Sequence, residues 1–168
     1  MTLSMYQASI PVITRELGIL SEILKKGEAL AAAKKIDPSV LINARLAPDM
    51  LPLAKQIQIA SDVTKGGIAR LAGAEIPSYA DTETTFAELQ ERIAKTIKFV
   101  SGFTAAQIDG SEEKTISLKV GGQDMQMKGQ QYLLGFVLPN LFFHITIAYA
   151  ILRHNGAELG KRDFLGSL

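Results

Sequence analysis

The residues of this sequence that are best suited to chemistry are its two histidines, His144 and His154. Imidazole serves as a metal ligand and as an acid or base near neutral pH. On one straight helix their separation would give about 15 Å of rise, so they cannot share a metal whose bonds to nitrogen are about 2.1 Å long. We therefore expect His144 to be the candidate ligand or acid/base. We expect His154 to lie near a helix C-terminus, where a positive charge is favourable.

Three further polar residues are candidates for a pocket around His144. Asn140 lies one helical turn earlier and should face the same inner side of the helix. Gln56 lies near the apolar stripe of another predicted helix, and we expect it to hydrogen-bond His144 or Asn140, because a buried polar group needs a partner. The hydroxyl of Tyr132 could line the pocket, although such residues more often pack with only the hydroxyl exposed.

Arg45 and Tyr79 are candidates to orient an anionic group beside His144. Asp49, which follows Arg45 before a predicted helix, is either a pocket residue or a helix cap. We find no phosphate-binding glycine loop, no HExxH sequence and no nucleophile elbow. The reaction, if there is one, is therefore not set by a known motif.

The uncharged stretch from Tyr132 to Leu152 is the central element. Its length would allow a transmembrane span, but it contains Pro139, Asn140 and His144, and the other long segments are amphipathic and charged. The alternatives are the buried core helix of a soluble bundle, with a hydrogen-bonded histidine, or a helix that carries a site. We expect this helix to begin near Pro139, which suits a first helical position. Residues 129–137 are expected to lead into it, with a short separate helix as one option.

Three more long helices are expected around it. Apolar residues at three-four spacing predict helices over residues 4–26, 53–71 and 85–100, the last with capping-box spacing at Thr85 and Glu88. Gly27 is the expected end of the first helix, and residues 28–35 are expected to form a short helical extension. The second is expected to expose Lys55, Gln58, Asp62 and Lys65. Residues 115–128 alternate apolar and polar residues around Gly121-Gly122, which predicts a small β-hairpin.

Composition sets further limits. The chain has 168 residues, 47% of them hydrophobic and 21% charged, and its net charge is +1. These values predict one globular domain over residues 1–168, and the net charge does not suggest nucleic-acid binding. There is no cysteine, so disulfides and thiolate chemistry are excluded. The first residues lack the pattern of a signal peptide, so we expect a cytoplasmic protein with no membrane partner.

Several motifs resemble a known family: LAPDM (46–50), ARLAG (69–73), PNLFFH (139–144), AYAILRHNG (148–156) and GKRDFLG (160–166). Together they resemble an uncharacterised domain-of-unknown-function family in the DinB/YfiT-like metalloenzyme superfamily. The resemblance implies an all-α, DinB-like four-helix bundle with crossover connections and frequent homodimers. In that superfamily three histidines, one from an early helix and two from the last helix at i and i+4, bind zinc or nickel. Some members are thiol-dependent transferases or isomerases.

This sequence departs from that pattern. His144 could match one ligand of the last helix, but the i+4 position is Ala148, and residues 50–71 contain no histidine. A divalent metal is thus implied by the resemblance but not by the residues; carboxylates such as Asp49 or Asp62 would have to replace the missing ligands. We expect a DinB-like homodimer without the typical metal site that binds a small molecule near His144. The alternatives are a thiol transferase or hydrolase, with or without a metal, and a purely structural or interaction protein whose hairpin extends a partner's sheet.

Overall fold

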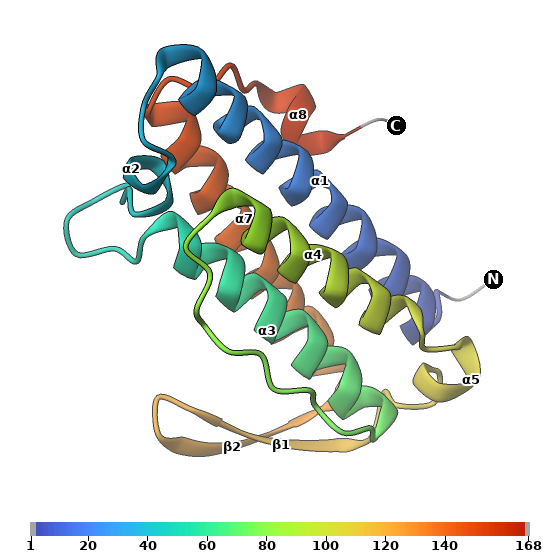
Figure 1. Ribbon diagram of the computed structural model, residues 1–168. Helices are drawn as coiled ribbons and strands as arrows, with labels where there is room; N and C mark the ends of the chain where they lie inside the picture. The colour runs from blue at the N-terminus through green and yellow to red at the C-terminus, as the bar shows by residue number, and fades with distance from the viewer. Residues whose placement is uncertain (1–2, 167–168) are drawn as a thin grey trace.

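Four long helices form the body of the protein in a computed structural model, which describes residues 3–166 (Figure 1). They are α1 (Met5–Lys34), α3 (Leu53–Ala72), α4 (Phe86–Ser101) and α7 (Leu138–His154). Helix α3 packs against α7 and α4, and α1 packs against α4 and α7, so the four helices surround one core. This core contains the fully buried side chains of Leu17, Ile57, Leu89 and Leu141, one from each helix. The predicted all-α bundle is confirmed.

The helices follow an up-down-down-up order. In Figure 1, α1 and α7 run in one direction, and α3 and α4 run in the other. Neighbours with the same direction cannot be joined by a tight turn, so residues 73–85 return along the length of the bundle from the end of α3 to the start of α4. A chain of 13 residues can span up to about 43 Å, which is enough for this return. The predicted crossover connection is this loop.

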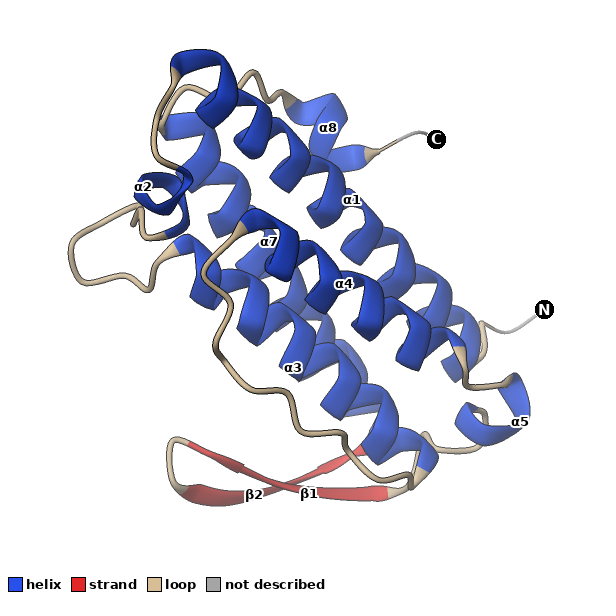
Figure 2. Ribbon diagram, viewed as in Figure 1, coloured by secondary structure: helices blue, strands red, loops and turns tan. Residues whose placement is uncertain are grey.

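Short elements complete the connections. Helix α2 (Pro38–Ile42) lies between α1 and α3, and α5 (Ala105–Ile108) follows α4. The strands β1 (Thr115–Val120) and β2 (Gln123–Lys128) form the predicted antiparallel hairpin, which projects from one end of the bundle (Figure 2). Gly121 and Gly122 have positive φ values of 57° and 83°, as a tight two-residue turn requires.

The first helix is longer than predicted. We expected Gly27 to end it, but α1 continues to Lys34. The reason is a close contact: a Cβ on Gly27 would lie 2.7 Å from Cδ2 of Leu152 in α7. Glycine is therefore present here because the two helices approach closely, and not because the helix stops.

The last helix also differs from its prediction. We expected a start near Pro139, but the chain is already helical from Gly129, through α6 (Gly129–Tyr132) and a π-helical turn, η1 (Leu133–Val137). A π-turn widens the hydrogen-bonding pattern, and it comes just before Pro139, which has no N–H to donate. The proline therefore follows an adjusted turn and does not begin the helix.

This continuous helix passes a simple test for a membrane span. Residues 129–154 are long and apolar enough to cross a bilayer by length and composition. However, the core helix of a soluble bundle passes the same test, and α7 packs against both α1 and α3. These contacts place the apolar helix in the core of a helical bundle.

Candidate functional site

His144 lies in the middle of α7 and faces α3. Its side chain is almost buried, with 8% of the residue exposed. Its Nδ1 atom lies 2.8 Å from Oε1 of Gln56, which is near the start of α3. The structure therefore confirms the predicted contact between these two residues, although they are 88 positions apart in the sequence.

A third group determines how Gln56 is oriented. The Nε2 amide of Gln56 donates a hydrogen bond to the backbone carbonyl of Leu51, at 2.9 Å. Its oxygen must therefore face His144, and an oxygen can only accept. Hence Nδ1 of His144 carries the hydrogen and donates it. In the neutral ring, the lone pair that can accept a proton is then on Nε2.

The environment of His144 favours this neutral form. Burial lowers the pKa of the imidazole below its ordinary value, because the charged form loses its water. Among the described residues, none forms a hydrogen bond with Nε2. Nε2 is also not one of the fully buried polar atoms that lack a partner in the described residues. The ring of Phe143, a residue that is 54% exposed, meets the imidazole edge-on at 5.2 Å between centroids. The site thus presents a neutral acceptor beside an exposed aromatic ring.

A divalent metal does not fit these residues. Over residues 3–166, no group of three or more histidine, cysteine, aspartate or glutamate side chains could hold an ion. The α3 residue that faces His144 is an amide, Gln56, and the residue one turn later on α7 is Ala148. Asp49 is exposed in the loop before α3, and Asp62 binds Arg92. The histidine triad of the superfamily cannot be assembled here.

The other candidates near His144 have structural partners. Asn140 is half-buried and donates to the carbonyl of Phe136, one turn earlier on its own helix, at 2.7 Å. Tyr132 is buried, stacks on Phe136, and its hydroxyl accepts a hydrogen bond from Arg70 at 3.2 Å. Burial raises the pKa of Tyr132. His154 is exposed in the last turn of α7, as expected from the helix dipole.

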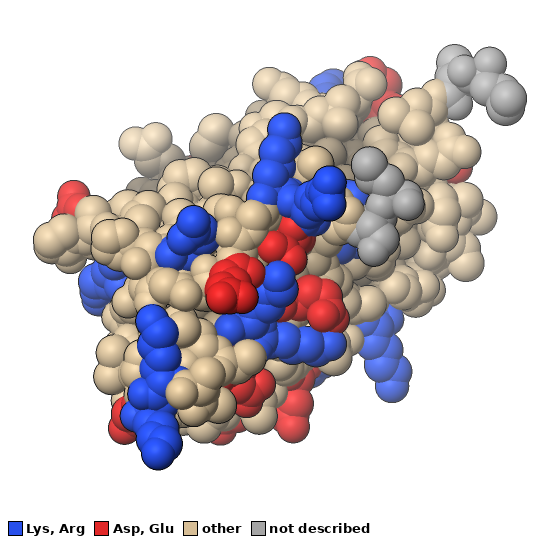
Figure 3. Space-filling model, turned by 90° about the horizontal axis from the view of Figure 1, so that it is seen from above, with Lys and Arg blue, Asp and Glu red and all other residues tan. Residues whose placement is uncertain are grey.

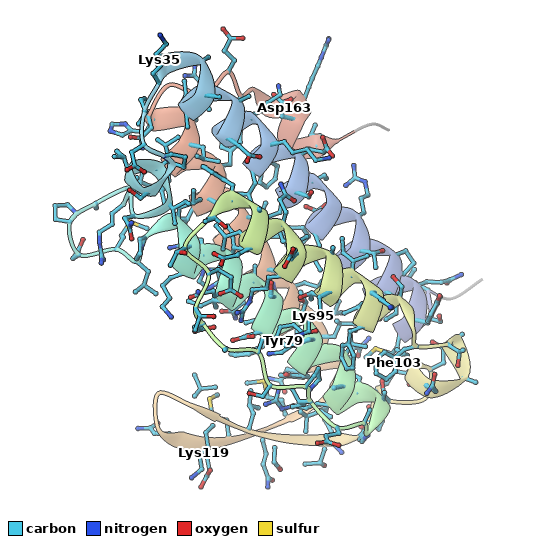
Figure 4. All side chains as sticks on the ribbon, in the orientation of Figure 1. Lys35, Tyr79, Lys95, Phe103, Lys119 and Asp163 are labelled. Atoms are coloured by element: carbon cyan, nitrogen blue, oxygen red, sulfur yellow. The ribbon has the colours of Figure 1, made fainter. Side chains whose placement is uncertain are left out.

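Arg45 and Tyr79 are not brought to His144. Arg45 donates a hydrogen bond to the carbonyl of Met50, in its own loop. The ring of Tyr79 lies instead over cations of α3 and α4, with Nζ of Lys95 at 3.9 Å and Nζ of Lys65 at 4.6 Å from its centroid. Figure 4 shows Tyr79 and Lys95 next to each other beside the crossover loop. An anion-orienting role at His144 therefore has no support from their contacts.

A buried arginine that we did not single out organises the crossover loop. Arg92 of α4 is 3% exposed and binds Glu83 at 2.9 Å, Asp81 at 3.0 Å and Asp62 at 2.9 Å. It also donates to the carbonyl of Ala80 at 3.1 Å. The sequence held one signal: Arg92 comes three residues after Leu89 and one before Ile93, beside the apolar stripe of its helix.

The same loop explains a wrong prediction about α3. Gln58 and Lys65, which we expected in water, are buried. Gln58 donates to Glu83 of the loop at 2.9 Å, and Lys65 lies under Tyr79. Both are buried because the crossover loop folds over this face of the helix.

Charges on the surface do not single out another site. On the face seen in Figure 3, lysines and arginines lie next to aspartates and glutamates, and neither sign dominates. A surface cleft of about 990 Å³ between α1 and α8 (Lys161–Leu165) is lined by both signs, and its Lys26 pairs with Asp163 at 2.6 Å. His144 does not line this cleft.

Comparisons with known proteins agree with this architecture. A family profile described as a domain of unknown function, DUF1993, matches residues 5–165. A solved structure of a DinB family member protein from Shewanella denitrificans is 42% identical to this chain. It superposes with a TM-score of 0.88, covering 97% of this chain and 92% of that chain. No curated protein matches the chain. The expected resemblance to a DinB-like family of unknown function is confirmed.

Proposed function

Because the chain belongs to the family of the domain of unknown function DUF1993, we propose that it is a metal-independent, DinB-like protein that binds a small molecule at His144. The observation that carries this proposal is the hydrogen-bonded chain from the Leu51 carbonyl through Gln56 to His144. It holds the imidazole in one tautomer and aims its only free acceptor, Nε2, away from Gln56. Such preorganisation lowers the cost of binding a hydrogen-bond donor.

The surroundings favour a particular class of ligand. Phe143 and Leu51 are both exposed apolar residues. The ring of Phe143 contacts the imidazole, and the backbone carbonyl of Leu51 holds Gln56. A neutral acceptor does not attract an anion, and no cation contacts the ring among the described residues. The ligand that fits is therefore a small apolar molecule with one O–H or N–H donor.

Phenol and toluene are a matched pair of probes, because they share an aromatic ring and only phenol has a donor. We expect phenol to shift the Nε2 resonance of His144 in a long-range proton–nitrogen NMR spectrum, and toluene to leave it in place. Prior treatment with a chelator should change neither result. Equal shifts with both probes would contradict the proposal. If the His144→Phe variant still bound phenol at the residues around position 144, that result would also contradict it.

Two further properties belong to this proposal. We propose that the protein is a homodimer, as the resemblance implied, and that it acts in the cytoplasm, as expected if its apolar helix α7 belongs to the core of a helical bundle. One structural feature supports the homodimer: the projecting hairpin leaves strand edges and Met125 exposed. A two-stranded hairpin alone is only marginally stable in water.

A further inference from the structure

The hairpin has a free edge that is shaped for pairing with a copy of itself. Over the described residues the sheet contains only β1 and β2, so the outer edge of β2 carries unpaired backbone groups. Exposed strand edges are usually blocked or paired, because they bind other strands. We propose that β2 pairs antiparallel with β2 of a second copy and forms a four-stranded sheet. This inference rests on the proposed homodimer and assigns its contact surface.

The register of the hairpin decides which residues face the edge. Val120 is opposite Gln123 across the two-residue turn, so this pair exchanges hydrogen bonds between β1 and β2. The alternation then turns the N–H and C=O groups of Gln123, Met125 and Met127 toward β1. Those of Asp124 and Gln126 and the N–H of Lys128 point to the open side, while the carbonyl of Lys128, the N-cap residue of α6, accepts the first hydrogen bond of that helix. On β2, only these last three residues can bond a second copy.

A two-fold axis leaves one pairing that uses all three residues. Asp124 lies opposite Lys128 of the partner subunit, and Gln126 lies opposite the partner subunit's Gln126. By symmetry, Lys128 lies opposite the partner subunit's Asp124. This arrangement makes about four backbone hydrogen bonds in addition to those that the Lys128 carbonyls form within α6. A shift by one residue would bring inward-pointing groups to the edge, and a shift by two would leave one of the three residues without a partner.

The side chains in this pairing are complementary. Each Asp124 is opposite a lysine of the other copy, and opposite charges directly across a strand pair are stabilising. On the other face Met125 lies opposite the partner's Met127, so the apolar faces of the two hairpins are continuous. Met125 is 38% exposed in the single chain, and Leu118 beside it is half-buried. Pairing would cover both more fully.

Existing contacts leave the edge accessible. Asp124 is 3.8 Å from Lys119 across the hairpin, and Lys128 donates to the carbonyl of Glu113; the side chains of both residues are largely exposed. Lys119 projects from the hairpin on the side away from the bundle in Figure 4. Asp124 would then lie between Lys119 of its own chain and the partner's Lys128. Lysine on an edge strand discourages unrelated partners, so this row of charges selects a second copy.

Charge reversal gives a direct test by sedimentation velocity at about 5 to 500 µM protein, a range suited to a contact of this small size. Asp124→Lys and Lys128→Asp should each place like charges opposite each other twice and weaken self-association about tenfold or more. An equimolar mixture of the two variants should restore dimers, because every lysine then meets an aspartate. Ser117→Lys, on the same polar face but on β1, is the control and should leave wild-type association unchanged.

A backbone variant tests the hydrogen bonds separately. The N–H of Gln126 points to the open edge, so Gln126→Pro in both copies removes the two central bonds of the proposed pairing without removing one from the hairpin. It should dissociate the dimer while circular dichroism and the melting temperature stay close to wild type. Dimers that persist in all three edge variants would overturn the hairpin contact but not the homodimer. Wild-type monomers over the whole concentration range would overturn both. A mixture that stays monomeric would also refute the pairing.

Discussion

At the scale of single residues, His144 is defined by its partner and not by its position on a helix. An uncharged helix with an isolated histidine is consistent with a metal ligand, a base or a core residue. The Gln56 amide distinguishes these roles, because it occupies Nδ1 and is itself held by the Leu51 carbonyl. Burial favours the neutral imidazole, and the Gln56 contact fixes its tautomer and leaves Nε2 as the one free acceptor atom.

Two substitutions of Gln56 should separate hydrogen bonding from charge. Gln56→Glu keeps an acceptor at Nδ1 and adds a negative charge, so it should raise the pKa of His144 above the wild-type value. Gln56→Leu removes the acceptor and should lower the free energy of unfolding by about 1–3 kcal/mol, because a buried N–H loses its partner. NMR titration and urea unfolding measure the two effects. A His144 pKa that does not move in Gln56→Glu would show that the amide does not determine the ring's protonation.

At the scale of elements, close approach explains glycines that helix propensity alone disfavours. Gly129 begins α6 directly after β2, and a Cβ there would collide with the backbone carbonyl oxygen of Ser111. Its N–H donates to the carbonyl of Lys114 at 2.9 Å. The start of the long helix is thus held against the loop before the hairpin, and no side chain fits between them.

Gly129→Ala and Gly18→Ala should have opposite effects. The first must displace backbone, so we expect it to lower the free energy of unfolding by about 3 kcal/mol or more. Gly18 lies inside α1, and no atom lies within 4 Å of the position that a Cβ would take there. Alanine at Gly18 should therefore raise stability by about 0.5–1 kcal/mol through helix propensity. Chemical denaturation of both variants checks this. A neutral Gly129→Ala would contradict the close approach.

At the scale of the whole molecule, the up-down-down-up order of the helices requires the long crossover loop to be held against the bundle. Residues 73–85 have few apolar side chains, and Arg92 holds them through Glu83, Asp81 and the Ala80 carbonyl. A hydrogen bond from Lys55, together with Arg92, lowers the pKa of Asp81. Burial alone would raise the pKa of Glu83, but hydrogen bonds from Arg92 and Gln58 outweigh it and the pKa is lowered.

These carboxyl groups predict a dependence of stability on pH. Because their pKa values are lower in the folded than in the unfolded chain, the folded state binds fewer protons. Their contribution is complete above the ordinary carboxyl pKa values and is lost as the pH falls below them toward the lowered values of the folded chain. Arg92→Met should lower the free energy of unfolding at pH 7 by about 2–4 kcal/mol, since it leaves carboxylates unpaired. It should also weaken the loss of stability on acidification to about pH 3.5.

Arg153→Met is the control, since Arg153 is exposed on α7; a surface change of this kind should stay within about 0.5 kcal/mol of wild type. Urea unfolding at both pH values measures all three proteins. If the Arg92 variant kept the full acid dependence of the wild type, the loop would not be fastened by these ion pairs.

The sequence by itself determined the elements of this protein. Apolar periodicity placed the long helices, the Thr85–Glu88 capping box placed the start of α4, and Gly121-Gly122 placed the hairpin turn. These signals are local, because each depends on residues within a few positions. Even the Gln56–His144 contact was foreseeable, since both residues had to be buried near the apolar sides of their helices.

Only the tertiary structure decided what the remaining polar residues contact. Gln58 and Lys65 look like exposed residues in α3, and they are buried because a loop from farther along the chain covers them. Gly27 looks like a helix end, and it is a contact with α7. Tyr79 and Arg45 look like partners for His144, and they bind elsewhere. Such contacts depend on the order of the helices around the core and on the path of the crossover loop, which no local pattern encodes.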